Sequence, residues 1–261
     1  MLTKEEILEI NARLREPFKN VTFKEKGHIY SVKGEKKPIK SVSSLVSFLH
    51  EPFPTDLIAP KYAKSRNLDV EDVKLGWSGE GDISGAHGTR VHLIGENYVR
   101  WKYFGECERP RPIDKQSLGA IQFINDLPDY LIPVALELIM FSPLYWYVGT
   151  CDGVLYNTKT GKFIIYDYKT NKSLKDEENA KPYLKYVNKG YGLRQDHFGK
   201  YSGQFSFYQI LLEEAGFEVE ARVLVWLRED EDKTKKKLYQ TFKTKNITKD
   251  LRNFLDLKLH L

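Results

Sequence analysis

The segment Phe163-Ile164-Ile165-Tyr166 constrains the fold most, because it is uncharged and apolar on both faces. This pattern is typical of a strand in the interior of a sheet, covered on both sides. The turn sequence Asn157-Thr158-Lys159-Thr160-Gly161 precedes it and joins it to a second apolar, β-branched segment, Tyr145–Tyr156. We therefore expect an antiparallel hairpin at the centre of a sheet.

Further elements are predicted on both sides of this hairpin. A capping box at Thr3-Lys4-Glu5-Glu6 predicts a helix near residues 4–14, and caps at Ser41 and Ser43 predict one near 44–49. Further helices are predicted from Gly88 to about Phe104 and at Lys115–Asn125, Gly203–Ala215 and Ile247–Leu259. Strands are predicted at Leu131–Phe141, Val219–Leu227 and Leu238–Lys243, with a short hairpin over 21–32. The polar residues 66–85 are expected to form a surface connection. Together these elements predict a mixed α/β (α+β) fold around one central sheet.

Composition limits the classes of protein that the chain can belong to. Its 261 residues carry 41 Lys and Arg against 36 Asp and Glu, and this net charge of +5 permits an anionic partner. No apolar run reaches the ~18–20 residues of a membrane helix, and the charged start predicts that no signal peptide is present. Two cysteines exclude a four-cysteine zinc or iron–sulfur site within one chain, and we expect a cytoplasmic protein.

Two acidic residues flank the hairpin turn at matching positions. Asp152 lies seven residues before Lys159 and Asp167 lies eight residues after it, so the two should be nearly opposed. Opposed residues of antiparallel strands have Cβ atoms only ~4.5–5.5 Å apart. Lys169 is two residues beyond Asp167 and leaves the same face of its strand. Two carboxylates and one ammonium are therefore expected to converge at the open end of the hairpin.

This arrangement favours a divalent-metal site. Two carboxylates so close repel each other unless a cation lies between them, and a hard ion with oxygen ligands satisfies both. Lys169 could orient or deprotonate a water molecule, or neutralise an anionic substrate. Such equipment suits metal-assisted hydrolysis of a phosphodiester. The alternative, a surface hairpin with incidental charges, fits less well with the uncharged strand before Asp167 and the glycines around Asp152.

Four motifs in fixed order extend this site. They are Gly88-Thr89-Arg90-Val91-His92, Gly149-Thr150-Cys151-Asp152, Asp167-Tyr168-Lys169 and Gln204-Phe205-Ser206-Phe207-Tyr208. The set resembles the RecB-like exonuclease branch of the PD-(D/E)XK nuclease superfamily over about residues 86–210. With its Ser41–Ser44 segment, the chain looks most like phage exonucleases and the mitochondrial genome maintenance exonuclease. The resemblance implies a restriction-endonuclease-like core at 86–261, within a single nuclease domain over 1–261 whose portion 1–85 is an N-terminal helical and hairpin extension.

The resemblance also implies roles for individual residues. His92, Asp152, Asp167 and the backbone carbonyl of Tyr168 would be ligands of Mg²⁺, which Mn²⁺ could replace. Lys169 would activate water. Gln204 and Tyr208 would orient Lys169 or contact DNA. Because the chain lacks the four cysteines found in some members of this branch, no iron–sulfur cluster is expected.

Two further features leave alternatives open. Glu137 lies in an apolar strand, where it is either a second-metal or water-mediated ligand beside Asp152 or a solvent-facing residue. The stretch 179–203 interleaves cations with aromatic rings and is predicted to bind single-stranded nucleic acid, or else to be a solvated loop. Its cations and rings are Lys181, Lys185, Lys189, Arg194 and Lys200, with Tyr183, Tyr186, Tyr191, Phe198 and Tyr201.

These observations lead to one expected function with two alternatives. We expect a Mg²⁺-dependent DNA exonuclease that acts on single-stranded or end-containing DNA in replication, recombination or repair. One alternative is a structure-specific or sequence-specific endonuclease on the same fold. The other is a nuclease-like module that binds DNA without cutting it, which the presence of both carboxylates and the lysine argues against.

Overall fold

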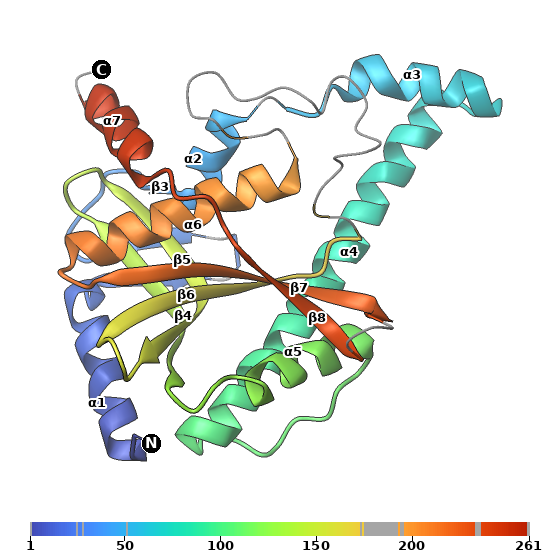
Figure 1. The fold of residues 1–261 in the computed structure, drawn as a ribbon. Helices are drawn as coiled ribbons and strands as arrows, with labels where there is room; N and C mark the ends of the chain where they lie inside the picture. The colour runs from blue at the N-terminus through green and yellow to red at the C-terminus, as the bar shows by residue number, and fades with distance from the viewer. Residues whose placement is uncertain are drawn as a thin grey trace.

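The chain folds around a six-stranded mixed sheet flanked by helices (Figure 1). The computed structural model describes residues 2–259 except 25, 28, 51, 173, 175–192, 194, 195 and 233–235. The strand order is β3-β5-β6-β7-β8, and β4 also pairs with β5. The strands are β3 (Lys40–Ser41), β4 (Leu131–Ser142), β5 (Tyr147–Asn157), β6 (Lys162–Lys169), β7 (Val219–Asp232) and β8 (Lys237–Lys243). The expected mixed α/β fold is confirmed.

The central hairpin has the predicted register. β5 and β6 are antiparallel, and Gly153 pairs with Tyr166. The next step along this ladder places Asp152 opposite Asp167. β6 lies between β5 and a parallel β7, and its residues Ile165 and Tyr166 are fully buried, as the apolar run of this strand predicts.

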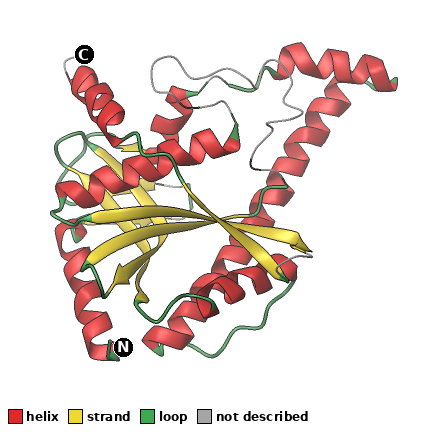
Figure 2. Cartoon of the chain, viewed as in Figure 1, coloured by secondary structure: helices red, strands yellow, loops and turns green. Residues whose placement is uncertain are grey.

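Helices cover both sides of the sheet. α6 (His197–Glu214) runs across one side, and α5 (Lys115–Asn125) with the C-terminal half of α4 (Val70–Val99) lies on the other (Figures 1 and 2). The remaining elements are α1 (Lys4–Arg15), a 3₁₀ turn (Glu16–Phe18), the hairpin β1 (Val21–Lys24) with β2 (Ile29–Val32), α2 (Val42–Leu49), α3 (Thr55–Arg66), a π-helical turn (Arg100–Phe104) and α7 (Thr248–Leu259). None of the described helices combines the length and apolar composition that a membrane span requires.

Local signals explain where several helices begin. Thr3 and Glu6 form the predicted capping box of α1, and Ser41 accepts the backbone N–H of Ser44 to cap α2. α6 begins at His197 rather than Gly203, because Asp196 caps it by accepting the N–H of Gly199. The end of the stretch expected as a loop is therefore helical.

The expected surface connection at 66–85 is wrong. α3 ends at Arg66 with Asn67 in the left-handed conformation, and α4 begins at Val70, capped by Asp69. The two helices pack on each other through a small core separate from the main one, consisting of Ala59, Ala63 and Val73 with Tyr62, Val70 and Trp77 around it. We call α3 and the N-terminal half of α4 the arm, which extends away from the sheet (Figure 1).

Candidate metal centre

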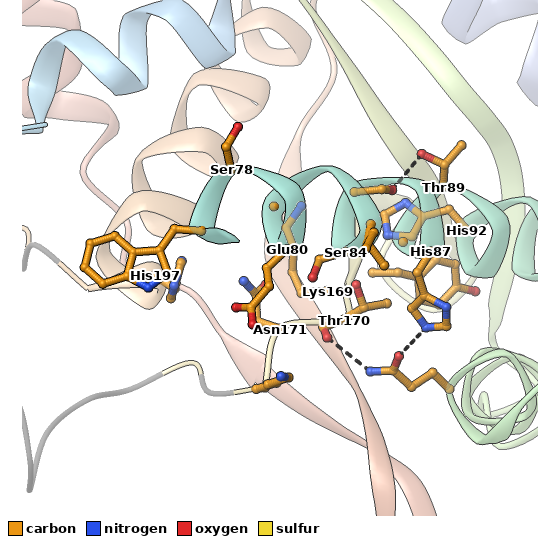
Figure 3. Close-up of a pocket in the computed structure, with 18 of the residues that line it drawn as sticks. Ser78, Glu80, Ser84, His87, Thr89, His92, Lys169, Thr170, Asn171 and His197 are labelled. Carbon is orange, nitrogen blue, oxygen red and sulfur yellow. Dashed lines mark hydrogen bonds between the residues drawn. The ribbon is translucent and has the colours of Figure 1, made fainter. Parts of the chain in front are cut away.

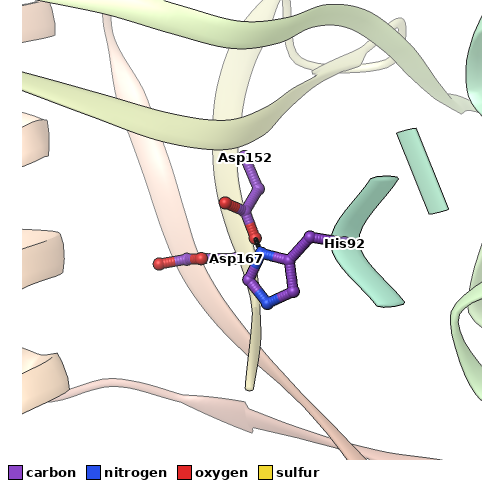
Figure 4. Close-up of side chains that lie close together, drawn as sticks. All are labelled: His92, Asp152 and Asp167. Carbon is purple, nitrogen blue, oxygen red and sulfur yellow. Dashed lines mark ion pairs between the residues drawn. The ribbon is translucent and has the colours of Figure 1, made fainter. Parts of the chain in front are cut away.

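Three elements bring His92, Asp152 and Asp167 together (Figure 4). His92 comes from α4, Asp152 from β5 and Asp167 from β6. One ligand atom of each residue lies within 4.8 Å of the others, and His92 Nδ1 is 3.1 Å from Asp152 Oδ2. The side chain of Asp167 is only 4% exposed. The two carboxylates predicted from the hairpin register, and the histidine implied by the resemblance, thus form one cluster.

The backbone and Lys169 complete the cluster. Lys169 Nζ lies 2.7 Å from Asp167 Oδ2 and 4.7 Å from the centre of the Tyr201 ring, so its ammonium is held in place. The Tyr168 N–H donates to Asp152 Oδ2 at 2.8 Å. The predicted convergence of two carboxylates and one ammonium is present. The carbonyl role of Tyr168 stays a prediction.

The electrostatics of the two acids differ. Burial and the charge of Asp152 raise the pKa of Asp167 well above its ordinary value. Burial also acts to raise the pKa of Asp152, but His92 and Lys169 outweigh it and hold that pKa below its ordinary value. Burial lowers the pKa of His92, yet Asp152 and Asp167 raise it on balance. Without an ion, the cluster therefore retains protons in order to compensate its negative charge.

The shifted pKa values of the two acids indicate that the cluster suits a metal ion. Two carboxylates this close can both be ionised only if their negative charge is compensated. A divalent cation compensates it better than protons do. Carboxylate oxygens with one imidazole nitrogen are donors that Mg²⁺ and Mn²⁺ accept. The donor set fits such an ion, with His92, Asp152 and Asp167 as its protein ligands.

Three glycines permit this assembly. A Cβ at Gly149 would lie 2.7 Å from Val42 Cγ2 and 2.8 Å from Tyr208 Cε1, and one at Gly153 would overlap the Tyr166 ring. On α4, a Cβ at Gly95 would lie 2.8 Å from Tyr168 Cε2. Only glycine allows these aromatic rings to lie so close to β5 and α4, the elements that carry Asp152 and His92.

Gln204 and Tyr208 share a face of α6, as predicted from their spacing. The Gln204 Nε2 donates to the Tyr208 hydroxyl at 2.7 Å, and the Tyr208 ring is buried against Gly149. Burial and the charge of Asp167 raise the pKa of Tyr208 well above its ordinary value, so the hydroxyl stays protonated beside the site. Tyr208 thus has a packing role, and its contact with DNA or Lys169 stays a prediction.

Glu137 lies next to Asp152 but outside the three-residue cluster. The pairing of Leu136 with Gly153 and of Leu138 with Cys151 places Glu137 opposite Asp152. Its φ of 43° is left-handed, a strained conformation in the middle of a strand. It is an exposed residue that lines a separate pocket of about 350 Å³ with Arg15 and Arg100. Partial burial of its carboxylate, with the charges of Asp152 and Glu96, raises its pKa to about 8.

The nucleic-acid contacts predicted for the 179–203 stretch fall mostly outside the described residues. This applies to Lys181, Tyr183, Lys185, Tyr186 and Arg194, whose role stays a prediction. Lys189 and Tyr191 also lie outside the described residues. Phe198, Lys200 and Tyr201 lie in the first turns of α6, where Tyr201 is beside Lys169.

A groove of about 1270 Å³ opens from the cluster and includes residues that the motifs did not indicate (Figure 3). His92 and Lys169 line it, and so do His87 and Gln116, whose Nε2 and Oε1 atoms are 2.7 Å apart. Gln116 also donates to the carbonyls of Thr170 and Leu227. If the sequence had predicted that α4 begins at Val70, it would also have predicted that α4 lines the groove, because residues 77, 81, 84, 88 and 92 follow one face of a helix.

Comparisons with known proteins add little to this geometry. The sequence matches no family model and no curated protein. A solved structure titled "Crystal structure of SSO0001" is similar over 98% of this chain and 84% of that chain, with 15% identity and a TM-score of 0.34. A likeness at that level carries no argument about function.

Proposed function

We propose that the chain is a Mg²⁺-dependent DNA exonuclease of the RecB-like branch of the PD-(D/E)XK superfamily. One observation carries the proposal: His92, Asp152 and Asp167 present ligand atoms within 4.8 Å of one another, with Lys169 Nζ 2.7 Å from Asp167, at the end of an open groove. A structural ion pair would not require a histidine and two acids from three elements to converge beside a groove. The reaction would be hydrolysis of a phosphodiester bond.

The residues of the cluster have different roles in the proposed hydrolysis. When bound, Mg²⁺ supplies Lewis-acid polarisation of a phosphoryl oxygen and lowers the pKa of water. Burial lowers the pKa of Lys169, but Asp167 and Asp152 raise it on balance, so its ammonium is charged at neutral pH. In this form Lys169 can donate to a phosphate oxygen or orient the attacking water, and it offsets charge that develops in the transition state. The buried Asp167 fixes the position of that ammonium.

Digestion of end-labelled DNA tests the proposal. Linear single and double strands, labelled at either end, are incubated with Mg²⁺ or with EDTA. We expect nucleotide release with Mg²⁺ and none with EDTA. A covalently closed single-stranded circle is the control, because an exonuclease leaves it intact whereas an endonuclease cuts it.

Two results would contradict the proposal in different ways. Cutting of the circle would indicate the endonuclease alternative. Binding of DNA without release of nucleotides, at any Mg²⁺ or Mn²⁺ concentration, would indicate the non-cleaving module.

A further inference from the structure

Lys169 lies between a carboxylate and an aromatic ring at the metal centre. Its side chain is only 14% exposed, and its Nζ is 2.7 Å from Asp167 Oδ2. The centre of the Tyr201 ring is 4.7 Å from the same Nζ. A lysine ammonium within about 6 Å of a ring centre is attracted by the negative face of that ring, and the attraction is stronger where water is excluded. The carboxylate and the ring thus both act on the position of the ammonium.

The Tyr201 ring is itself fixed at its hydroxyl. The hydroxyl donates to Asn171 Oδ1 at 2.5 Å. Asn171 is two residues beyond Lys169, where the chain leaves β6, and its carbonyl accepts from Trp226 Nε1 of β7 at 2.6 Å. The ring is therefore bonded to a segment that is tied to the sheet. It cannot turn away from Lys169 without losing that bond.

A ring in this position stabilises the ammonium without consuming its hydrogens. An ammonium has three N–H donors, and Asp167 Oδ2 accepts one of them. A second carboxylate in place of Tyr201 would accept another and would neutralise more of the charge. An aromatic ring attracts the cation but leaves the other donors available to a phosphate oxygen or a water molecule. The pair of partners therefore holds Lys169 in a form that can still act on a substrate.

Tyr201 also lies on the helix face that carries one of the four motifs. Residues 201, 204 and 208 of α6 follow the spacing of one helix face. The resemblance implies that Gln204 or Tyr208 orients Lys169, and the polar atoms of these two residues are bonded to each other at 2.7 Å. Tyr201 is half-buried and lines the groove together with Lys169 and Asn171 (Figure 3). It is thus placed between α6 and the ammonium.

We propose that Tyr201 is a positioning residue for Lys169: its ring, oriented by Asn171, holds the ammonium at Asp167 and leaves N–H donors for the substrate phosphate. This inference rests on the proposed nuclease function and extends it, because it assigns the orientation of Lys169 to a residue outside the four motifs. It also gives the Tyr201 ring a role other than stacking on a base.

Nuclear magnetic resonance of lysine labelled with ¹³C at Cε tests the contact without DNA or metal. Protons close to the face of an aromatic ring resonate upfield, so the Cε protons of Lys169 should lie upfield of those of exposed lysines. Lys169→Arg identifies this signal by removing it. The upfield shift should persist in Tyr201→Phe and disappear in Tyr201→Leu. The same shift in Tyr201→Leu, or an unshifted Lys169 signal in the wild type, would overturn the proposal.

Single-turnover digestion of end-labelled linear DNA with Mg²⁺ tests the role of the contact. At saturating DNA, Tyr201→Leu should lower the rate about 2- to 30-fold, the range that corresponds to loss of one cation–π contact. Tyr201→Phe should restore most of the rate, because the ring remains. Tyr130→Leu is the matched control and should cleave at the wild-type rate. Lys159 Nζ lies 3.9 Å from the Tyr130 ring centre, but this pair is at the turn of the β5–β6 hairpin, at the end opposite the metal centre.

A second background separates positioning from other roles. In Lys169→Ala, the additional change Tyr201→Leu should have no further effect, because the ammonium that the ring holds is missing. An equal loss of rate in both backgrounds would overturn the proposal, and so would weaker DNA binding by Tyr201→Leu with an unchanged rate at saturation. If the wild type releases no nucleotides with Mg²⁺ or Mn²⁺, the nuclease proposal fails, and with it the role in hydrolysis. The lysine signals would still decide whether the ring holds the ammonium.

Discussion

At Asp167, burial and charge conflict. Its carboxylate is almost fully buried, beside a second carboxylate, and has one lysine as its ion-pair partner among the described side chains. A chain under selection for stability alone gains little from such a group, because replacing buried ions by apolar residues is often neutral or stabilising. The arrangement is explained if the two acids act together on a cation.

Asp167→Asn therefore tests the metal centre directly. In the wild type, Mg²⁺ at about 100 times its Kd should stabilise the fold by about 2.7 kcal/mol and raise the Tm by about 5–10 °C. The variant should lose most of that shift, because an amide oxygen is a weaker ligand. Thermal unfolding with Mg²⁺ and with EDTA measures it. Asp129→Asn, at an exposed position, should keep the full shift. An equal shift in both variants would place the ion elsewhere.

Lys169→Ala should separate ion binding from chemistry. Lys169 touches Asp167 and is not a ligand of the ion, so the Mg²⁺-dependent rise in Tm should persist. The rate of nucleotide release should fall about 10²- to 10⁴-fold, the usual range for loss of one group that moves or orients a proton. Single-turnover digestion measures this. A variant that retains wild-type activity would exclude the role proposed for Lys169.

At the scale of elements, α4 carries both the metal centre and the arm, and its glycines differ in what surrounds them. Gly95 lies against the Tyr168 ring, whereas Gly79 has no side chain or distant backbone atom within 4 Å of where a Cβ would be. The first glycine is required by packing. The second costs helix stability of about 0.8–1 kcal/mol relative to alanine.

Alanine at these two positions should thus have opposite effects. Gly95→Ala should lower the free energy of unfolding, because overpacking costs about 1–3 kcal/mol and outweighs the gain in helix propensity. It should also lower nuclease activity, since Tyr168 or the α4 segment with His92 must shift. Gly79→Ala should raise the free energy of unfolding by up to about 1 kcal/mol and leave activity unchanged. Urea unfolding measures both, and destabilisation by both variants would contradict this account of α4.

The strands and the hairpin were predictable from the sequence, whereas the arm was not. The apolar runs predict β5 and β6, and the turn residues around Lys159 fix their register and hence the approach of Asp152 to Asp167. The N-terminal half of α4 contains Gly76, Gly79, Gly81 and Gly85, which are typical of loops, and it buries only Val73 before Val91. This half of α4 is stabilised by its Asp69 cap and by packing on α3, so its sequence shows almost no helical periodicity of apolar residues. His92 was predicted only through motif resemblance, because it lies on α4 and Asp152 lies on β5, and the packing of that helix against that strand cannot be predicted from local sequence.

A surface contact between α5 and β8 gives a pH-dependent contribution to stability. Asp126, at the C-terminal end of α5, accepts from the Tyr239 hydroxyl at 2.7 Å and pairs with Lys237 at 2.9 Å. Burial acts to raise its pKa, but these two partners lower it below its ordinary value. A carboxyl with a lowered folded-state pKa stabilises the fold above its unfolded pKa, and this contribution is lost as pH falls through the folded pKa.

Asp126→Asn should then destabilise the chain at pH 7 and matter less at pH 3. The difference in free energy of unfolding between wild type and variant should be below about 1 kcal/mol, because the pair is exposed. Urea unfolding at both pH values measures it, with Asp129→Asn as the control for loss of one acid. A difference that grows toward pH 3 would have the wrong sign for this contact.

At the scale of the whole molecule, the described residues form two cores of unequal size. The main core includes buried residues from α1 to α7, whereas the arm has only Ala59, Ala63 and Val73 fully within its own core. Little buried apolar area stabilises the arm, so its free energy of local unfolding should be lower than that of the sheet. Because Thr55, Lys74 and Trp77 of the arm also line the groove, ligand binding in the groove should change the opening of the arm.

Hydrogen exchange resolves these two units within a single helix. Amides over 70–86 of α4 should exchange much faster than those over 91–99, where Val91, Gly95, Tyr98 and Val99 are buried against the main core. Under the proposed function, a saturating single strand of DNA in EDTA should slow exchange over 70–86, since a ligand that binds only the closed arm stabilises it by mass action. The same strand should leave β7 unchanged. Equal protection in both halves of α4 without DNA would mean that the arm unfolds together with the sheet, and it would remove the physical basis for treating the arm as a separate unit.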